Sequence, residues 1–379
     1  MRMPKKRILF VVNVDWFFLS HRLPIAVESK KRGYEVHVAT SLTTGVATLE
    51  ENGFEVHALH MHRSRKSIRA NMLSWLDILR VFWRVKPDLV HLVTIKPVLL
   101  GGIAARLLRV KGVVVAVSGL GYVFFNETWK AKAIRALVKR IYYSALNHKN
   151  IKVIFQNPYD RDEITQFTPI TNFQSVIIKG SGVDLRNFSP NPFESDRPVV
   201  IMASRLLRDK GVVEFIAAAK KIRERNVDCE FILAGDTDSD NPSSITQKEL
   251  LGWKNEGIVN IVGYCDDIAG LFAKCHVVVL PSYREGLPKV LLEAAASGRA
   301  VITTNVPGCR DAIIPGKTGV LVEKKNIDGL VAAMMTLIQD RNLCTKMGRA
   351  GRVLAEREFN IESVVNRHLE IYEELMASI

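Results

Sequence analysis

Short runs of consecutive apolar residues alternate with helical patterns along the chain, and the whole scheme occurs twice. The run Val277-Val278-Val279-Leu280 has no polar residue, so neither face of such a strand can lie against water. Strands of this kind belong to parallel sheets that helices cover on both faces. Because strands and helices alternate in two successive sets, the sequence predicts an α/β protein with two doubly wound, Rossmann-like domains.

The two sets of elements are separated by a proline-rich stretch over residues 188–198, which lacks periodicity and is the best linker candidate. We expect an N-terminal domain over 1–190 and a C-terminal domain over 191–379, with the last helices packing back on the N-terminal domain. The expected strands are 7–13, 35–41, 54–60, 88–94, 113–118, 153–156, 175–179, 199–204, 230–234, 260–262, 277–281, 300–303 and 319–322. The expected helices are 21–32, 70–85, 97–110, 128–148, 158–167, 210–225, 267–274, 289–297, 327–338, 343–357 and 362–376.

Composition excludes several classes of protein. Hydrophobic residues make up 47% and charged residues 24% of the chain, which is ordinary globular usage and excludes disordered, collagenous and coiled-coil proteins. No uncharged apolar run reaches the ~20 residues of a membrane span, and the N-terminus does not have the pattern of a signal peptide. The five cysteines show no Cys-x-x-Cys spacing, so we expect a reducing cytoplasm and neither a disulfide framework nor a zinc site.

Charge is divided unevenly between the two halves of the chain. Residues 1–190 hold 29 Lys and Arg against 13 Asp and Glu, a net charge of +16, whereas residues 191–379 have a net charge of −2. This asymmetry favours an anionic partner for the first half, such as nucleic acid, an anionic lipid or a phosphorylated substrate. A general contribution to solubility is the alternative.

Two motifs follow expected strands of the second half, at the sheet edge where doubly wound proteins bind ligands. In the first, Arg205 and Lys210 flank a short loop that opens a helix, an arrangement suited to clamp a diphosphate. In the second, Glu285 lies in a loop, where a carboxylate suits sugar hydroxyls, and Glu293 lies on a helix that begins near Pro288. The alternative for the first motif is a solvated basic loop. The alternative for the second is that Glu285 is an exposed loop residue and Glu293 a charge on a helix face. With two such domains, we expect the site in the cleft between them.

These motifs resemble the signature of a known family. Arg205-x4-Lys210-Gly211, followed by Glu285-x7-Glu293, is similar to the pattern of retaining, nucleotide-sugar-dependent glycosyltransferases of family four. The likeness extends over nearly the whole chain and includes the segments 180–190 and 308–312. It implies the GT-B fold, in which two Rossmann-like domains face a central cleft.

The resemblance implies three catalytic residues. Arg205 and Lys210 would hold the donor diphosphate and stabilise the charge of the leaving nucleotide, and Glu285 would contact the donor sugar. The reaction would proceed without a metal or another cofactor and with retention at the anomeric carbon. The nucleotide sugar would be a substrate.

Further donor contacts are implied at four positions. The backbone amides of Gly286 and Leu287 would contact the sugar and phosphate, and Glu293 would bind the ribose. Tyr264, in the stretch 263–268, would border the base.

Two departures from the family concern the acceptor side. The family's Gly-Gly loop after the first strand is missing, and Ser118 stands where the family often has the His of a His-Gly pair. Asp15 and His21 are the alternative candidates for an acceptor-side group. Arg22 and Lys96, at strand ends, would meet an acceptor diphosphate.

The first half of the chain also has a pattern that predicts binding to a membrane. Basic residues are interleaved with aromatic ones over residues 63–83 and 129–143, a pattern suited to an anionic membrane surface. The alternative is that these aromatic residues belong to the core and the basic ones are merely solvated. No recognition motif supports a nucleic-acid partner.

The resemblance is closest to bacterial enzymes that act on polyprenyl-diphosphate-linked glycans. It implies transfer of a hexose or N-acetylhexosamine from a UDP-linked donor, in O-antigen or capsule biosynthesis, by a cytoplasmic protein peripheral on the inner face of the membrane. A nucleotide-sugar 2-epimerase of the same fold and a non-catalytic membrane-associated protein are the alternatives.

Three patterns imitate metal or cofactor sites. The stretch 236–240 imitates an Asp-x-Asp metal motif and a calcium loop, but it lacks the glycine and glutamate of a calcium loop and is interpreted as a solvated loop. His57, His60 and His62 lack a supporting carboxylate or cysteine spacing and are interpreted as an edge cluster. The glycines at 119 and 121 are too few for a dinucleotide fingerprint, which argues against a dehydrogenase.

Overall fold

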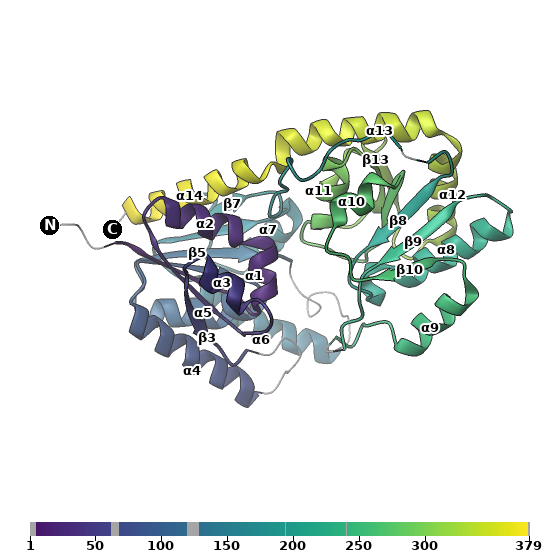
Figure 1. Ribbon diagram of the computed structural model, residues 1–379. Helices are drawn as coiled ribbons and strands as arrows, with labels where there is room; N and C mark the ends of the chain where they lie inside the picture. Colours follow the sequence, from purple (N-terminus) through teal and green to yellow (C-terminus); the bar gives the residue numbers. More distant parts are fainter. Residues whose placement is uncertain (1–4, 62–67, 120–128, 194, 240, 378–379) are drawn as a thin grey trace. The chain divides into compact units, whose positions relative to one another are not determined.

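A computed structural model describes residues 5–61, 68–119, 129–193, 195–239 and 241–377, which form two compact units (Figure 1). The N-terminal unit comprises residues up to Ser181 together with Val364–Ile379, and the C-terminal unit comprises Gly182–Ser363. The predicted boundary lies nine residues later than this one, at 190/191. The difference arises because Val183 and Phe188 belong to the hydrophobic core of the C-terminal unit.

The N-terminal unit is built on a seven-stranded sheet in the order β3-β2-β1-β4-β5-β6-β7. Every neighbouring pair in this sheet is parallel. Its central strands β4 and β5 are fully buried; β5 has only apolar residues, and β4 contains one polar residue, His91. The strands are β1 (Arg7–Val11), β2 (Glu35–Thr40), β3 (Glu55–Ala58), β4 (Leu89–Val93), β5 (Gly112–Val117), β6 (Ile151–Phe155) and β7 (Ser175–Ile177).

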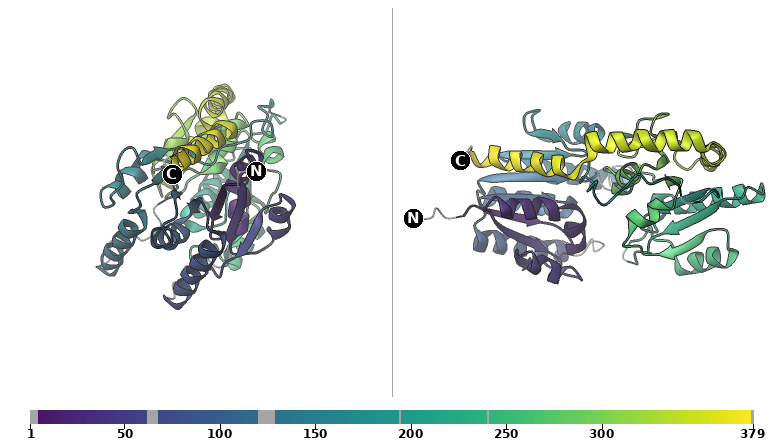
Figure 2. Two further views of the ribbon diagram at one scale, coloured as in Figure 1. Left: turned by 90° about the vertical axis from the view of Figure 1, so that its left-hand side faces the viewer. Right: turned by 45° about the horizontal axis from the view of Figure 1, so that its top comes forward.

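Helices connect these strands. They are α1 (Asp15–His21), α2 (Leu23–Lys31), α3 (Val46–Glu51), α4 (Ile68–Val85), α5 (Ile95–Leu107), α6 (Trp129–Leu146) and α7 (Pro158–Thr165). The final helix, α14 (Ile361–Ala377), packs on this unit for most of its length (Figure 2). There Arg32, after α2, pairs with Glu373 at 2.8 Å, and Lys152 of β6 pairs with Glu374 at 2.9 Å.

The C-terminal unit is built on a six-stranded parallel sheet in the order β10-β9-β8-β11-β12-β13. The strands are β8 (Val199–Ala203), β9 (Glu230–Ala234), β10 (Asn260–Gly263), β11 (Val277–Leu280), β12 (Ala300–Thr304) and β13 (Gly319–Val322). The helices are α8 (Val212–Glu224), α9 (Gln247–Glu256), α10 (Ile268–Ala273), α11 (Lys289–Ala296), α12 (Ile327–Gln339) and α13 (Arg341–Leu354). A 3-10 turn, Arg208–Lys210, precedes α8.

Three helices were not predicted from periodicity: α1, α3 and α9. Helix α9 is mostly polar and has no fully buried residue, so it carries no apolar stripe. It begins with a capping box, in which the Thr246 side chain accepts from the amide of Glu249 and the Glu249 carboxylate accepts from the amide of Thr246. The Thr-x-x-Glu spacing was therefore the sequence signal for this helix.

The alternation of apolar and helical segments thus predicts the doubly wound architecture correctly. Within the described residues, no helix combines the length and the apolar character that a bilayer span requires.

Candidate active site

The strand order of the C-terminal unit aligns the predicted donor residues along one sheet edge. Tyr264 follows β10, Arg205 follows β8 and Glu285 follows β11. Because the strands are parallel and run in the order β10-β9-β8-β11-β12, their carboxyl ends lie side by side. The structure therefore places these residues in a row, with Tyr264 at one end and the cations between it and Glu285.

Lys210 and Glu285 meet directly at the centre of this row. The Lys210 ammonium forms an ion pair with Oε1 of Glu285, and the hydroxyl of Ser282 donates to the same oxygen at 2.8 Å. The two ionic side chains are only 21% and 11% exposed. A partly desolvated ion pair of this kind interacts more strongly than a surface pair, so it fixes both groups in place.

Backbone and side-chain contacts hold the two loops together. The amide of Tyr283 donates to the carbonyl of Asp209 at 2.8 Å, and the Tyr283 hydroxyl donates to Glu214 of α8 at 2.5 Å. Gly211 has a positive φ of 79°, and a Cβ there would lie 2.3 Å from the carbonyl oxygen of Pro281. Glycine at 211 therefore permits the close approach of the Lys210 loop to the Glu285 loop.

Arg205 is held by a carboxylate that the sequence interpretation assigned to a solvated loop. The guanidinium of Arg205 pairs with Asp238 at 2.9 Å, and the Asp238 side chain is only 15% exposed. The amide of Asp238 donates to the Ser244 hydroxyl at 2.9 Å, and the amide of Ile245 donates to the carbonyl of Leu206 at 2.9 Å. The interpretation of Asp238 as merely solvated is wrong, because these contacts bind its loop to the Arg205 loop; Asp240 lies outside the described residues.

Glu293 is a buried carboxylate on α11, the helix that follows the Glu285 loop. Its side chain is 11% exposed and pairs with Lys289, one turn earlier, at 3.2 Å. Burial raises the pKa of Glu293, and the Lys289 ammonium opposes that shift. The contact of Glu293 with the donor ribose stays a prediction.

The raised pKa of Glu293 makes a testable statement about stability. Between the ordinary pKa and the raised value, the folded protein binds a proton that the unfolded chain has released, so wild-type stability falls as pH rises through this range. Glu293→Gln removes the titration. The melting temperature of this variant relative to wild type should rise with pH, which thermal scans between acidic and neutral pH would measure. A difference that stays constant with pH would contradict the assignment.

The backbone at Gly286 and Leu287 is enclosed by the loop after β12. Gly308 has a φ of +81°, and a Cβ there would lie 2.4 Å from the carbonyl oxygen of Gly286 and 2.6 Å from that of Glu285. The hydroxyl of Thr304 also donates to the carbonyl of Ser282. The role of Gly308 in the site was not predicted. The signal that could have indicated it is that Gly308 follows β12, a buried strand next to β11 in the same sheet.

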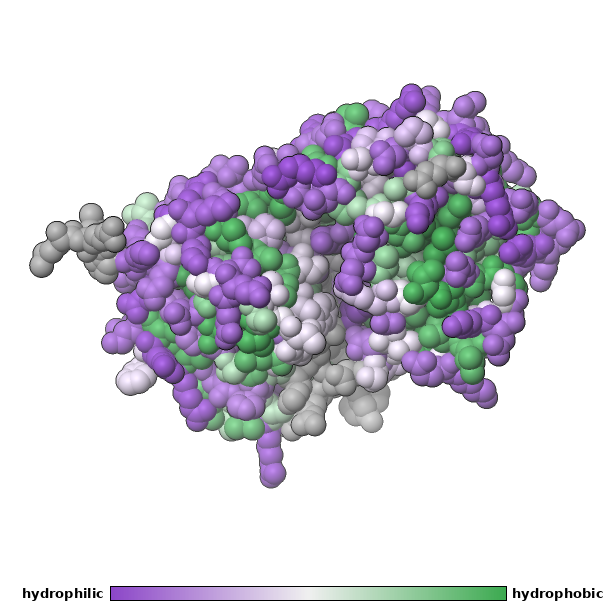
Figure 3. Space-filling model, viewed as in Figure 1, coloured by the Kyte–Doolittle hydropathy of each residue, from purple (hydrophilic) through white to green (hydrophobic). Residues whose placement is uncertain are grey.

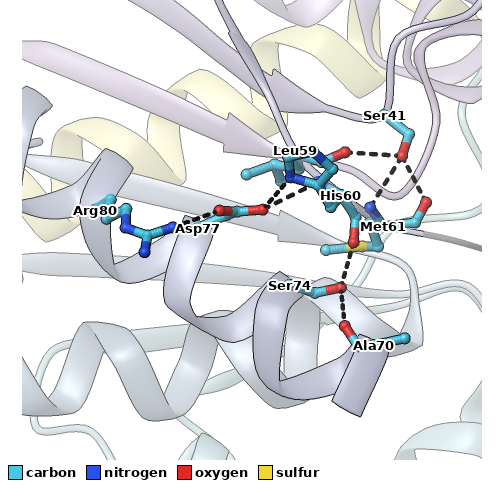
Figure 4. Close-up of polar contacts among 8 residues, drawn as sticks. All are labelled: Ser41, Leu59, His60, Met61, Ala70, Ser74, Asp77 and Arg80. Atoms are coloured by element: carbon cyan, nitrogen blue, oxygen red, sulfur yellow. Dashed lines mark hydrogen bonds and ion pairs between the residues drawn. The ribbon is translucent and has the colours of Figure 1, made fainter. Parts of the chain in front are cut away.

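In the parts of the chain that the structure describes, no group of three His, Cys, Asp or Glu side chains is arranged so that it could hold a metal ion. His60 pairs with Asp77 of α4 at 2.8 Å (Figure 4). Nε2 of His57 lies 3.1 Å from Nδ1 of His37. These two histidines therefore have separate partners. His62 and Gly121 lie outside the described residues.

The acceptor-side candidates lie in the N-terminal unit. Asp15, Lys96 and Ser118 follow β1, β4 and β5, which are neighbours in the sheet, so all three stand at its carboxyl edge. Burial lowers the pKa of Lys96. His21 stacks on Phe17 with ring centroids 4.1 Å apart. Their roles toward an acceptor stay predictions.

Asp15 is a fully buried carboxylate with several donors. It accepts from the amides of Trp16 at 2.7 Å, Thr43 at 2.5 Å and Gly45 at 3.0 Å, and from the Thr43 hydroxyl. Burial alone would raise the pKa of Asp15, but these hydrogen bonds hold it below its usual value. Its observed contacts fix the loop after β2.

Arg22 has a different environment from the one the sequence interpretation assigned. The residue is 2% exposed, and burial lowers the pKa of its guanidinium to about 10. It lies near His91, His368 and Tyr372, the last two from α14. The predicted contact between Arg22 and an acceptor diphosphate is therefore not supported, because the side chain is a core group.

The membrane hypothesis concerns α4 and α6, and each of these helices has side chains both in the core and on the surface. Phe82 and Tyr142 are 2% and 1% exposed and belong to the core, as the alternative interpretation held. Trp83, Leu137 and Tyr143 are 72%, 60% and 49% exposed. Arg63, Arg65 and Lys66, and the side chains of Trp129, Lys130 and Lys132, lie outside the described parts.

Two family models match the chain, one in each unit. The model described as Glycosyl transferase 4-like matches residues 7–157, and the model described as Glycosyl transferases group 1 matches residues 184–354, which contain the whole row of donor residues. Both units match glycosyltransferase families, and the chain is a glycosyltransferase. This match confirms the predicted family and its enzymatic class.

The glycosyltransferase is similar to curated enzymes over most of its length. It is 26% identical to the N,N'-diacetylbacillosaminyl-diphospho-undecaprenol alpha-1,3-N-acetylgalactosaminyltransferase of Campylobacter jejuni, over 98% of this chain and 100% of that one. It is also 26% identical to the UDP-Gal:alpha-D-GlcNAc-diphosphoundecaprenol alpha-1,3-galactosyltransferase of Escherichia coli, over 82% of each chain.

Solved structures confirm the fold of the glycosyltransferase. The Anabaena protein HepE, in complex with UDP, superposes with a TM-score of 0.78 at 19% identity and covers 97% of this chain and 100% of that one. The two Rossmann-like units are those of the GT-B fold, as predicted.

Proposed function

We propose that this glycosyltransferase moves a hexose or N-acetylhexosamine, with retention, from a UDP-sugar to a glycan carried on a polyprenyl diphosphate. The product would serve surface-polysaccharide synthesis, as O-antigen or capsule. The observation that carries the donor half is the contact of Lys210 with Glu285 beside Arg205 on one sheet edge. Two cations and one carboxylate suit a diphosphate joined to a sugar.

The proposed chemistry uses these three side chains without a metal. As the bond between the anomeric carbon and the diphosphate oxygen breaks, negative charge grows on the leaving nucleotide. Arg205 and Lys210 would stabilise that charge in exchange for their present partners, Asp238 and Glu285. Glu285, released from Lys210, would accept hydrogen bonds from the sugar hydroxyls.

The acceptor half of the proposal is supported by the curated relatives. The names of both relatives specify a glycan on diphospho-undecaprenol, and the Campylobacter enzyme matches this chain from end to end. A membrane-anchored acceptor requires the enzyme to work at a membrane surface. We therefore place the protein on the inner face of the membrane, with an anionic lipid surface as its partner.

A thermal-shift panel tests the donor class. UDP-glucose, UDP-galactose, UDP-N-acetylglucosamine, UDP-N-acetylgalactosamine and UDP should raise the melting temperature, and GDP-mannose should not. A ligand at 100 times its Kd adds about 2.7 kcal/mol to the free energy of unfolding. The proposal fails if no uridine nucleotide stabilises the protein while another nucleotide does.

The acceptor is tested with the donor that the panel selects. Turnover should require a lipid-diphosphate-linked sugar and should form a new glycosidic bond. Release of free sugar epimer without any acceptor would instead establish the epimerase alternative.

A further inference from the structure

His60, one of the three histidines within residues 57–62, stands at the carboxyl edge of the N-terminal sheet. It follows the end of β3 by two residues, and Asp15, Lys96 and Ser118 follow β1, β4 and β5 at the same edge. We call this the acceptor edge, because the acceptor-side candidates lie on it. The strand order places His60 at one end of the acceptor edge.

Hydrogen bonds join the loops of the acceptor edge from β1 to β3. The amide of Asp15, after β1, donates to the carbonyl of Ser41, after β2, at 3.1 Å. The Ser41 hydroxyl accepts from the amide of Met61 at 3.2 Å and lies 3.0 Å from the carbonyl oxygen of Leu59 (Figure 4). The loop that carries His60 is therefore held in place relative to the loop of Asp15.

Helix α4 fixes both the ring and the backbone of His60 (Figure 4). Nδ1 of His60 lies 2.8 Å from Oδ2 of Asp77, and the backbone amide of His60 donates to the same oxygen at 3.1 Å. The Ser74 hydroxyl donates to the carbonyl of His60 at 2.6 Å, and Arg80 donates to Oδ1 of Asp77 at 3.0 Å. The carboxylate that the spacing of the histidines did not indicate thus comes from α4, 17 residues later.

These contacts determine which hydrogen-bonding group His60 presents to solvent. A carboxylate only accepts hydrogen bonds, so Nδ1 carries the proton, and Nε2 of the neutral imidazole keeps its lone pair. The His60 side chain is 81% exposed, and its Nε2 makes no hydrogen bond within the described residues. His60 therefore presents one acceptor atom in a fixed direction.

Stability alone does not account for this arrangement. Exposed pairs contribute little to the free energy of unfolding, and Asp77 already has Arg80 as a partner. The visible face of the N-terminal unit mixes hydrophilic and hydrophobic residues, so exposure alone does not mark a site (Figure 3). His60 differs because its ring, amide and carbonyl are all held. Such preorganisation lowers the entropic cost of a contact with a ligand.

We propose that Nε2 of His60 accepts a hydrogen bond from a hydroxyl of the acceptor glycan, and that Asp77 is the positioning residue that orients it. A lone pair attracts the hydrogen of a sugar hydroxyl and repels a phosphate oxygen, so the contact is with the glycan and not with the diphosphate. The inference rests on the proposed function, because it requires a glycan acceptor. It gives an acceptor role to a histidine that the sequence patterns placed in an edge cluster.

Steady-state kinetics of the full chain test this contact, with a synthetic N-acetylglucosaminyl-diphospho-lipid as acceptor and the UDP-sugar that the thermal-shift panel selects. His60→Ala should raise the acceptor KM roughly tenfold, the effect of one lost hydrogen bond. The kcat at saturating acceptor and the donor KM should stay within about twofold of wild type, because the contact is made equally before and during reaction. His60→Gln should recover most of the loss, since its amide oxygen also accepts. Both variants should keep the wild-type melting temperature.

Asp77→Asn tests the positioning role. The new amide can donate to Nδ1 as well as accept from it, so the ring no longer has one fixed tautomer, and the acceptor KM should rise roughly fivefold. The double variant His60→Ala with Asp77→Asn should lose no more than His60→Ala alone, because Asp77 acts through His60. An additional loss in the double variant would contradict the positioning role.

His57→Gln is the matched control. His57 belongs to the same group of histidines, but it lies within β3, where its Nε2 is 3.1 Å from Nδ1 of His37. Glutamine keeps polar atoms for that contact. The acceptor KM of this variant should equal that of wild type.

A wild-type acceptor KM in His60→Ala, or an equal rise in His57→Gln, would overturn the inference and leave the proposed function intact. The same lipid diphosphate without a sugar should inhibit wild type and His60→Ala with equal inhibition constants. An inhibition constant that rises together with the acceptor KM would assign His60 to the diphosphate and refute the glycan contact. If wild type bound UDP but transferred sugar to no lipid-linked acceptor, the proposed function would fail, and the role of His60 with it.

Discussion

Lys210→Ala is expected to lower kcat for sugar transfer by about 10²- to 10³-fold, the usual cost of one preorganised charge-stabilising group. The substitution removes a cation from the leaving diphosphate. It also leaves Glu285, whose side chain is 11% exposed, without its ammonium partner. Initial rates with saturating donor and acceptor would measure the effect. Glu285→Gln should produce a loss of similar size, because the amide keeps the shape of the side chain and loses its charge.

The matched control for this prediction is Lys221→Ala. Lys221 also pairs with a carboxylate, Asp328, but the two side chains are 45% and 82% exposed. Exposed pairs contribute ~0–1 kcal/mol, so rate and stability should both stay close to wild type. Transfer at the wild-type rate by a folded Lys210→Ala protein would refute the assignment of the site.

Gly308→Ala is expected to abolish most transfer activity, by about 10²-fold or more, although position 308 carries no functional group. The new methyl group would lie 2.4 Å from the carbonyl oxygen of Gly286, which is closer than van der Waals contact permits. The Glu285–Gly286 loop must move, and displacements of about 1 Å at a reacting group cost about 10²-fold in rate. The left-handed φ of +81° adds roughly 1–2 kcal/mol of backbone strain.

Gly316→Ala separates these two effects. Gly316 also has a positive φ, of 72°, but a Cβ there would meet nothing within 4 Å. This control therefore carries the backbone strain without the collision, so it should lose stability and keep the wild-type kcat. Donor titration and thermal unfolding of both variants would complete the comparison. Equal activity in the two variants would show that the loop does not depend on Gly308.

The fold follows from residues that act locally, which explains why the sequence predicts it well. Runs such as Val277–Leu280 have only one stable environment, a covered parallel sheet, and the order of elements then determines the topology. Helix α9 was missed because its polar surface hides the period, although its Thr246–Glu249 capping box was visible.

The parts of the candidate site that follow from strand ends could be predicted from the sequence, whereas the contacts made by distant loops and helices could not. Lys210 and Glu285 were predicted at the same sheet edge because each follows a strand of a parallel sheet, and such strand ends lie side by side. Their direct ion pair was not predicted. The contact of Asp238 with Arg205 depends on how a long irregular loop folds back, which no periodicity encodes. Arg22 is buried beside residues of α14, which lies far along the chain. The residues next to Arg22 in the sequence therefore give no sign that it is buried.

The place of α14 also determines the order in which this protein can mature on the ribosome. His91 of β4 lies 2.5 Å from the hydroxyl of Tyr372, across 281 residues of sequence. Domains generally fold as they are synthesised, the first one earliest. Here the first sheet stays without its covering helix, and Phe10 without the aromatic ring of Tyr372 that packs against it, until the second unit has been translated. During that interval the nascent chain exposes apolar surface that chaperones recognise.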